Sequence, residues 1–302
     1  MIDFQKIDLS QKEKYNRYLM HCGDRGCEYS LTNLRLWGRQ RVAFVNDYLT
    51  IFSQFERSSV YPFPIGHGDV KPVLDAIIQD ARERGLQCRL SSLTPEDCAT
   101  LEELYPGEFC FHPDRDSSNY VYSIDNLADL PGRKYQKKRN HLNKFRQNHP
   151  DCQFLPIEEQ WLPGIEKLIT AWYKARYDED PHEYHMEQTA LRRAFSHWEV
   201  LGLEGLVMVE YGNVLAMTLG SWLSEDTFDI HFEKAAEDVD GAYTAINQAF
   251  AAHLREKYPQ LRYLNREDDL GIPGLRKAKL SYYPDKLAVK FWANLWEDDD
   301  DH

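Results

Sequence analysis

The stretch that decides the fold is LEGLVMVEYGNVLAMTLGSWLSEDTFDIHFEKAAEDVDGAYTAINQAFAAHLREK, residues 203–257. It contains two apolar runs on either side of Gly212-Asn213, a pair that favours a tight hairpin turn. A third apolar run, Thr227 to Lys234, precedes a segment with apolar residues at helical spacing from Ala242 to Lys257. This order predicts three antiparallel strands followed by a helix, which is typical of α+β folds.

The first half of the chain shows a related order of elements. Asn46-Asp47 separates two apolar runs in the same way, because Asn and Asp tolerate the left-handed angles of a hairpin turn. Thr94 is expected to cap a helix that begins at Pro95. The other predicted helices span 69–85, 11–22, 31–38, 157–177, 186–201 and 274–280, and the other strands span 41–46, 48–55, 59–65, 88–90, 120–124, 261–264 and 287–295. The two halves therefore predict a duplicated α+β plan.

The composition is that of a folded protein without a membrane segment. The 302 residues are 42% hydrophobic and 28% charged, which is typical of globular chains. No run of 18 apolar residues exists and the start lacks a signal-peptide pattern, so we expect a cytoplasmic protein. The six cysteines include no CxxC pair of the kind that zinc sites use, so we expect no metal. A net charge of −13 disfavours broad binding to RNA.

One basic segment interrupts this acidic chain. Arg133 to His149 carries seven Lys or Arg and no acid, and its spacing is helical through Phe145. We therefore predict a domain over residues 1–125, a basic connecting helix over 126–150, and a second domain with the active site over 151–302. The cations either bind phosphates or form a solvated helix that pairs with acids.

Four segments carry a resemblance to a known family. The specific ones are the second and the fourth, and together the four span nearly the whole chain. The segments are Tyr61-Pro62-Phe63-Pro64-Ile65-Gly66; Asp114-Arg115-Asp116 with Tyr120-Val121-Tyr122, Leu130-Pro131-Gly132-Arg133-Lys134, Lys137-Lys138-Arg139-Asn140-His141 and Phe145; His231-Phe232-Glu233-Lys234 with Gly241-Ala242-Tyr243 and Ile246-Asn247; and Asn265-Arg266-Glu267-Asp268-Asp269-Leu270-Gly271 with Gly274-Leu275-Arg276-Lys277-Ala278-Lys279. The chain thus resembles the soluble catalytic region of lysyl-phosphatidylglycerol synthases and their stand-alone relatives, the DUF2156 group.

The resemblance implies a fold and a reaction class. The implied fold is two tandem GNAT-like (acyl-CoA N-acyltransferase-like) domains, each a mainly antiparallel sheet flanked by helices. The implied reaction moves an acyl or aminoacyl group from an activated donor, aminoacyl-tRNA or acyl-CoA, to an amine or hydroxyl. The acceptor would be a small molecule, a peptide or a lipid headgroup. We expect no tightly bound cofactor, because either donor would act as a substrate.

Acyl transfer needs a base, a stabilised oxyanion and an acid for the leaving group. Glu233 is the leading candidate for the base, although a solvated charge at a strand end is an equal reading. Asn265 and Asp268 either orient an acceptor amine or cap the helix over 274–280. Tyr282 either protonates the leaving group or packs as an aromatic residue. His231, on a strand, reads as a core residue rather than a catalyst.

Candidate residues for binding the donor and its phosphates lie in three places. The candidates in the basic segment either bind phosphates or form a solvated helix face. Arg276 and Lys279 are three positions apart, so they share one face of the predicted helix over 274–280. The turn Glu237-Asp238-Val239-Asp240-Gly241 is acidic and would repel the pyrophosphate of coenzyme A, so we expect Asp238 or Asp240 to cap the following helix. The donor-binding candidates are Lys134, Lys138, Arg139, Arg276, Lys279, Gly241, Tyr243 and Asn247.

Two functions of different classes remain in view. The leading hypothesis is an acyltransferase or aminoacyltransferase of the GNAT superfamily. The alternative is a protein that keeps the fold and binds a ligand without turning it over, and the acidic turn before Tyr243 favours it. Function belongs to the site rather than the fold, so the geometry of the site decides between them.

Overall fold

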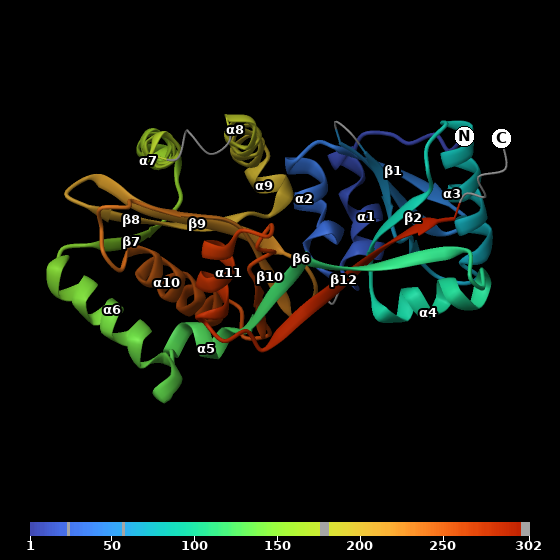
Figure 1. Cartoon of the computed structure of the whole chain (residues 1–302). Helices are drawn as coiled ribbons and strands as arrows, with labels where there is room; N and C mark the ends of the chain where they lie inside the picture. The colour runs from blue at the N-terminus through green and yellow to red at the C-terminus, as the bar shows by residue number, and fades with distance from the viewer. Residues whose placement is uncertain (23–24, 56–57, 176–180, 297–302) are drawn as a thin grey trace. The chain divides into compact units, whose positions relative to one another are not determined.

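The computed structural model describes residues 1–22, 25–55, 58–175 and 181–296, without the side chains of 181–184. Within this part the chain forms two units, and each contains one part of a 12-stranded sheet together with helices that flank it (Figure 1). The first unit comprises residues 1–119, 268–273 and the segment from 287 onward. The second unit comprises residues 120–267 and 274–286. Most strand pairs in both units are antiparallel, so the fold is α+β with mainly antiparallel sheets.

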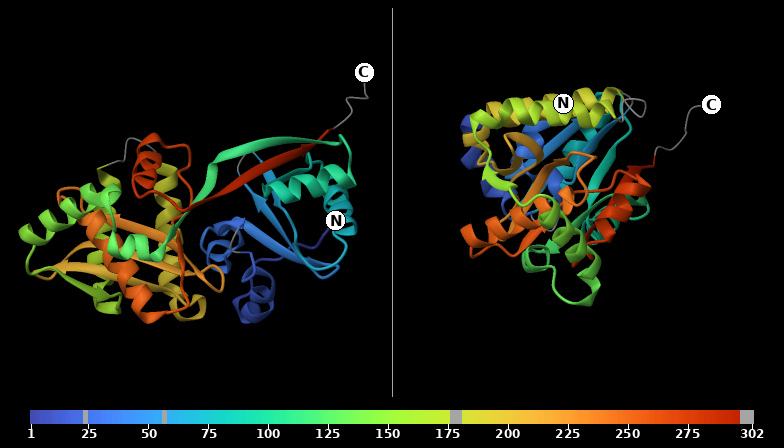
Figure 2. Two further views of the ribbon diagram at one scale, coloured as in Figure 1. Left: turned by 90° about the horizontal axis from the view of Figure 1, so that it is seen from below. Right: turned by 90° about the vertical axis from the view of Figure 1, so that its left-hand side faces the viewer.

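The first unit has a mixed sheet with the strand order β1-β2-β3-β5-β12-β6. Its last strand in sequence, β12, runs beside β6 (Figure 2) and pairs on its other side with β5. β3 and β5 form the parallel pair, while β4 adds to β2. The elements are α1 (Lys12–Leu19), α2 (Leu31–Leu36), β1 (Gln40–Val45), β2 (Tyr48–Gln54), β3 (Ser59–Pro62), β4 (Ile65–Gly66), α3 (Lys71–Glu83), β5 (Arg89–Leu93), α4 (Pro95–Leu104), β6 (Phe109–Ser123) and β12 (Lys286–Leu295).

Each face of this sheet buries its own apolar cluster. On one face, residues of α3 and α4 such as Ile77 and Leu101 pack with Phe52 and Tyr61 of the strands. On the other face, α1 and α2 pack on alternate strand residues such as Ile51. Successive strand residues point to opposite faces, which explains how β2 supplies both clusters.

Two local predictions for this unit are confirmed. Asn46 and Asp47 have φ of 47° and 58°, as a two-residue hairpin turn between β1 and β2 requires. Thr94 caps α4, and Asp97 returns the bond to complete a capping box.

The second unit has the strand order β6-β11-β10-β9-β8-β7, with β6 contributing its last residues. Helix α7 packs on one face of this sheet, whereas α10 packs on the other face and is covered by α5 and α6 (Figure 1). The elements are α5 (Ile124–Asp129), α6 (Gln136–Asn148), β7 (Gln153–Pro156), α7 (Leu162–Lys174), α8 (Pro181–Ser196), α9 (Trp198–Leu201), β8 (Glu204–Glu210), β9 (Asn213–Trp222), β10 (Thr227–Ala235), α10 (Ala242–Lys257), β11 (Tyr263–Asn265) and α11 (Pro273–Leu280).

The structure confirms the predicted hairpin, which β8 and β9 form, and the predicted strand and helix, which are β10 and α10. The two turn residues of the hairpin are Tyr211 and Gly212, however, because Asn213 already pairs with Glu210. Four other parts of the prediction differ from the structure. β6 begins at Phe109 rather than Tyr120, β7 was not predicted, α7 starts at Leu162, and the helix predicted over 186–201 is broken at His197. The predicted end of the 157–177 helix lies outside the described residues. Among the described helices, none combines the length and the apolar character that crossing a bilayer requires.

Candidate functional site

The candidate site of the second unit lies where β10 and β11 separate. Their parallel register covers Thr227–Asp229 of β10 and ends at Asn265, so β10 continues without β11 beside it. The pairing of β10 with β9 also shifts between Ile230 and Phe232, which places His231 in a β-bulge. Bulges redirect side chains and are frequent beside active sites. The polar side chains that follow on both strands therefore converge beyond this point.

A buried ion pair occupies the opening. Arg266, directly after β11, donates from Nη2 to Oε1 of Glu233 at 2.7 Å, and the two side chains are 14% and 10% exposed. Asn247 of α10 donates from Nδ2 to the other carboxylate oxygen at 3.2 Å. Strand, loop and helix thus meet at Glu233, and its charge is compensated rather than solvated.

Two polar atoms beside this carboxylate are buried without a hydrogen-bond partner among the described residues. One is Nη1 of Arg266, a donor, and the other is Oδ1 of Asn247, an acceptor. A buried polar group without a partner costs about 1–3 kcal/mol. The site therefore offers one donor and one acceptor to a group that binds beside Glu233.

Two cations face the ring of Tyr282. Lys138 Nζ lies 3.7 Å from the ring centroid, and Arg266 Cζ lies 5.0 Å from it. Burial, followed by the positive charge of Arg266, lowers the pKa of Lys138 to about 8. Burial raises the pKa of Tyr282, whose hydroxyl donates to Thr244 Oγ1 at 3.3 Å. Near neutral pH the site thus contains an amine close to its titration point and a protonated phenol.

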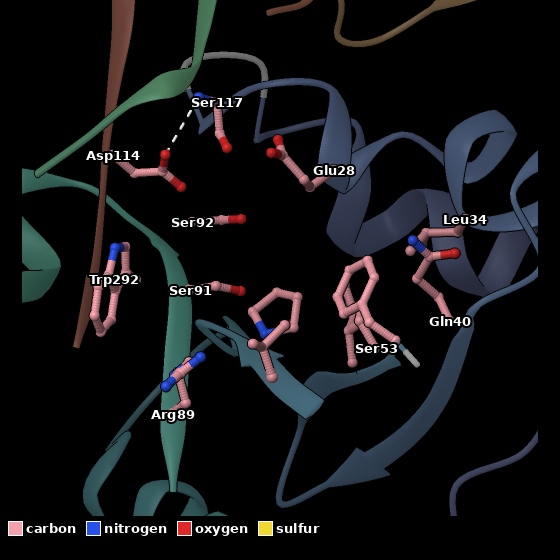
Figure 3. Close-up of a pocket in the computed structure, with 14 residues that line it drawn as sticks. Glu28, Leu34, Gln40, Ser53, Arg89, Ser91, Ser92, Asp114, Ser117 and Trp292 are labelled. Carbon is pink, nitrogen blue, oxygen red and sulfur yellow. Dashed lines mark hydrogen bonds between the residues drawn. The ribbon is translucent and has the colours of Figure 1, made fainter. Parts of the chain in front are cut away.

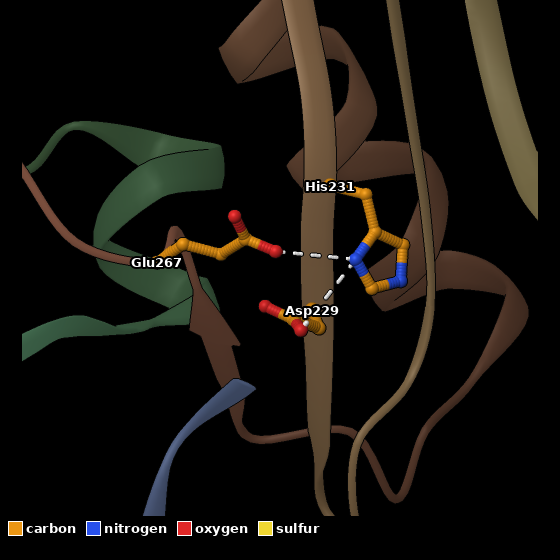
Figure 4. A group of neighbouring side chains, drawn as sticks. All are labelled: Asp229, His231 and Glu267. Atoms are coloured by element: carbon orange, nitrogen blue, oxygen red, sulfur yellow. Dashed lines mark hydrogen bonds and ion pairs between the residues drawn. The ribbon is translucent and has the colours of Figure 1, made fainter. Parts of the chain in front are cut away.

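A second buried cluster surrounds His231 (Figure 4). Its Nδ1 lies 3.2 Å from Glu267 Oε1 and 3.6 Å from Asp229 Oδ2, and its Nε2 lies 2.8 Å from Ser221 Oγ. The ligand atoms of Asp229, His231 and Glu267 lie within 4.8 Å of one another, so these three residues have the geometry to hold a cation. Equally, an imidazole that bridges a hydroxyl and two carboxylates satisfies itself by hydrogen bonds. His231 is therefore a buried histidine whose two ring nitrogens both have hydrogen-bond partners, in agreement with its prediction as a core residue.

The structure brings four of the predicted site residues together: Glu233, Asn247, Tyr282 and Lys138. A fifth, Lys279 of α11, donates from Nζ to the backbone carbonyl of Arg266. Arg266 itself was missed as a site residue. The available signal was its place inside the Asn265-to-Gly271 motif.

Other predicted residues stand apart from this group. Asn265 is buried and accepts from the backbone N–H of Glu267 at 2.7 Å, so it shapes the turn after β11. Asp268 belongs to the first unit. Tyr243 is 38% exposed, and its hydroxyl accepts from Trp172 Nε1 at 2.7 Å.

The basic segment is only partly free to bind an anion. Arg139 donates from Nη1 to the carbonyl oxygen of Leu130 and, at 2.7 Å, to that of Gly132, so it holds the loop before α6. Lys134 is exposed, with its ammonium 5.5 Å from the ring centroid of Tyr283. Arg276 lies half-buried on α11.

The turn before α10 differs from the prediction. Gly241 is the N-cap residue with φ 83°, no side chain caps the helix, and Asp240 instead pairs with Lys144 of α6 at 2.7 Å. A Cβ at Gly241 would lie 2.9 Å from the carbonyl oxygen of His141. The prediction that Asp238 or Asp240 caps α10 was therefore wrong, because the close approach of α6 fixes this turn.

Comparisons with known proteins show the fold and the family of the chain. A protein of Bacteroides thetaiotaomicron, solved as a conserved protein of unknown function, is 35% identical with a TM-score of 0.92, covering 98% of this chain and 100% of that one. L-PGS of Bacillus licheniformis has a TM-score of 0.68 at 15% identity, over 98% and 94% of the two chains. A tandem GNAT protein from the clavulanic acid biosynthesis pathway has a TM-score of 0.53 at 9% identity, over 99% and 100%, so the fold is GNAT-like.

A curated relative, an uncharacterized protein of Mycoplasmoides gallisepticum, is 28% identical over 176 residues, which is 58% of this chain and only 55% of the relative's length. The model of the family described as phosphatidylglycerol lysyltransferase, C-terminal, matches residues 21–294. That span carries both the Glu233–Arg266 pair and the His231 cluster. The chain therefore belongs to the family of the C-terminal region of phosphatidylglycerol lysyltransferases.

Proposed function

We propose that the second unit transfers an aminoacyl group from an activated donor to an amine or hydroxyl acceptor. One observation carries the proposal: the unfilled donor of Arg266 and the unfilled acceptor of Asn247 flank Glu233. An aminoacyl group presents a carbonyl oxygen, which accepts, and an ammonium, which donates and is positive. The carbonyl would bind Arg266, and the ammonium would bind Glu233 and Asn247. A simple acyl group has no such ammonium.

The reaction would proceed by direct attack. The acceptor nitrogen or oxygen adds to the carbonyl carbon of the donor, the acceptor loses a proton, and the ester oxygen leaves as a hydroxyl after gaining one. Arg266 would stabilise the oxyanion, and Lys138 in its neutral form would take the acceptor's proton, since its pKa of about 8 makes this form accessible. Tyr282, whose raised pKa keeps its hydroxyl protonated, would donate a proton to the leaving ester oxygen.

This assignment moves the role of general base from Glu233 to Lys138. Both oxygens of Glu233 already accept hydrogen bonds from Arg266 and Asn247, which suits it to hold an ammonium group. With Lys138 as the base, we expect activity that rises through pH 8.

We propose aminoacyl-tRNA as the donor, acting as a substrate without a bound cofactor. The family is named for a lysyltransferase, and the exposed cation Lys134 suits contacts with phosphates of RNA. The acidic turn before Gly241 disfavours acyl-CoA, because its carboxylates would repel a pyrophosphate at this helix N-terminus. A tRNA donor would also place the protein in the cytoplasm. The acceptor class, whether small molecule, peptide or lipid headgroup, is left to the assay.

We further propose that each unit is a GNAT-like domain. The support is the GNAT-like fold together with the repeated order of three antiparallel strands and a helix in both halves. The division predicted from the sequence, 1–125, 126–150 and 151–302, differs from these units, because residues 268–273 belong to the first unit and α6 to the second.

The test measures the release of labelled amino acid from bulk aminoacyl-tRNA and from lysyl-tRNA, with acetyl-CoA as the competing donor. The acceptors are a primary amine, a tripeptide and phosphatidylglycerol vesicles. We expect turnover with an aminoacyl-tRNA that falls at least tenfold in Lys138→Met and Asn247→Ala. Lys137→Met, changed on the exposed side of the same helix, is the matched control and should keep full activity.

Turnover with acetyl-CoA alone would replace the proposal by ordinary acyl transfer. Binding of tRNA without turnover for any acceptor would favour the alternative, a ligand-binding protein that retains the fold. Equal activity of Lys138→Met and wild type would remove Lys138 from the mechanism.

A further inference from the structure

The first unit contains a pocket that the proposed transfer reaction does not use. Its volume is about 290 Å³, near the lower end of the range for sites that hold small molecules. All of its lining residues belong to the first unit. Figure 3 shows Ser91 and Ser92 of β5 pointing into it, with Glu28, Asp114 and Ser117 around its upper end.

The upper end holds one carboxylate without a cationic partner. Asp114 accepts a hydrogen bond from the backbone N–H of Ser117 at 3.3 Å, and within the described residues no Lys, Arg or His pairs with it. Glu28 differs, because the buried ammonium of Lys290 donates to its carboxylate. The net charge presented to a ligand at this end is therefore negative and comes from Asp114.

The pocket also has one cation without an anionic partner. Arg89 donates from Nε to the side-chain oxygen of Asn294 at 2.8 Å, and its guanidinium carbon lies 5.1 Å from the ring centroid of Trp292. Over the ranges that the structure describes, no carboxylate pairs with this guanidinium. The terminal N–H groups of the Arg89 guanidinium remain for a ligand, and two such groups can donate together to one carboxylate.

An apolar wall completes the pocket. Phe55, Val60 and Pro62 line it, and the phenylalanine is 39% exposed. An exposed aromatic ring beside charged groups suits a ligand that carries an apolar group between polar ends.

The backbone is distorted where it supplies the polar wall. Ser92 has φ 54°, in the left-handed region that non-glycine residues rarely adopt within a strand. The register of β12 against β5 shifts here, because Phe291 pairs with Leu93 and Ala293 with Leu90, so Ser91 and Ser92 form a bulge opposite Trp292. This bulge presents lining residues to the pocket, and strained backbone of this kind clusters at ligand sites.

We infer that this pocket binds a zwitterion, a free amino acid or a short peptide. The ligand's ammonium pairs with Asp114, its carboxylate pairs with Arg89, and its side chain packs on Phe55 and Pro62. The hydroxyl groups of Ser91 and Ser92 supply hydrogen bonds between these ends. The inference does not depend on transfer activity in the second unit, because every group that it uses lies in the first.

The test is isothermal titration of the full chain with L-leucine and L-leucyl-L-leucine, each compared with its N-acetyl and C-amide forms. The chain has seven tryptophans, so the part of the fluorescence change that Trp292→Phe removes reports on Trp292 in parallel. We expect binding of at least one free zwitterion, with at least a tenfold loss when either terminus is masked. Asp114→Asn should abolish the discrimination against the N-acetyl form, and Arg89→Gln that against the C-amide form.

Two exposed substitutions in the same unit, Glu103→Gln and Arg82→Gln, serve as charge-matched controls and should leave binding unchanged. Equal binding of masked and free forms would overturn the inference, as would a loss of binding in the controls equal to that in Asp114→Asn. Absence of binding by every zwitterion to folded wild-type protein would also overturn it. The two lengths of ligand decide between a single amino acid and a peptide.

Discussion

Lys138→Met should stabilise the protein at pH 7, although it removes a cation from the candidate site. The pKa of Lys138 falls from 10.5 to about 8, a shift of about 2.5. At about 1.4 kcal/mol for each unit, the buried charge costs about 3 kcal/mol relative to the unfolded chain. Loss of the contact with Tyr282, worth about 1 kcal/mol, offsets part of the gain. The expected net stabilisation is about 2 kcal/mol.

The sign of the pH dependence follows from proton linkage. Between pH 8 and 10.5 the unfolded chain retains the proton that folded Lys138 has lost, so wild-type stability rises with pH in this window. Above it the ammonium is neutral in both states. The advantage of Lys138→Met should therefore be full below pH 8 and disappear as the pH approaches 10.5.

Urea unfolding of both proteins at pH 7, 8.5 and 9.5 measures this difference, and groups common to both cancel. Lys137→Met, at an exposed position of the same helix, should show no such pH dependence. A Lys138→Met protein that is less stable than wild type by the same amount at every pH would refute the reasoning.

Three other substitutions test the contacts of the second unit by urea unfolding. Glu233→Gln leaves Arg266 buried without its anion and should lower the free energy of unfolding by about 3–5 kcal/mol. If the ion pair is the cause, the same substitution should cost less in a protein that already carries Arg266→Met. Gly241→Ala places a Cβ at φ 83° and 2.9 Å from a backbone oxygen of α6, so a loss of more than about 1 kcal/mol is expected, and a neutral result would contradict the close approach. Ser221→Ala removes the partner of His231 Nε2 and should cost about 1–3 kcal/mol, while an unchanged midpoint would show that this bond contributes nothing.

Several features follow from residues that are neighbours in the chain. The Asn46-Asp47 turn, the turn that contains Gly212 and the Thr94 cap depend on backbone angles and hydrogen bonds within a few residues. The first part of β6 was missed for the opposite reason. Its residues 111–119 are largely polar, and their partner strand β12 lies about 170 positions later in the chain.

The candidate site shows the same division. The residue types at Glu233, Tyr282 and Asn247 were predicted from the sequence, as was the basic segment that contains Lys138. The partner of Glu233 was not predicted, because the sequence shows only a carboxylate at a strand end, which is usually solvated. Arg266 is far from it in the chain, and only the fold brings the two side chains together. The low pKa of Lys138 was also beyond prediction, since burial and the field of Arg266 arise only when α6 and β11 pack together.

By itself the sequence determined the α+β class, the hairpins, the central helix and the family motifs, all of which depend on local spacing. The tertiary structure alone decided which charges meet. It joined Ser221, His231 and Glu267 from two strands and a loop, and it formed the pocket of the first unit from residues as distant as Glu28, Asp114 and Trp292. Electrostatic energies fall with distance and rise with burial, and both quantities are set only when the segments pack.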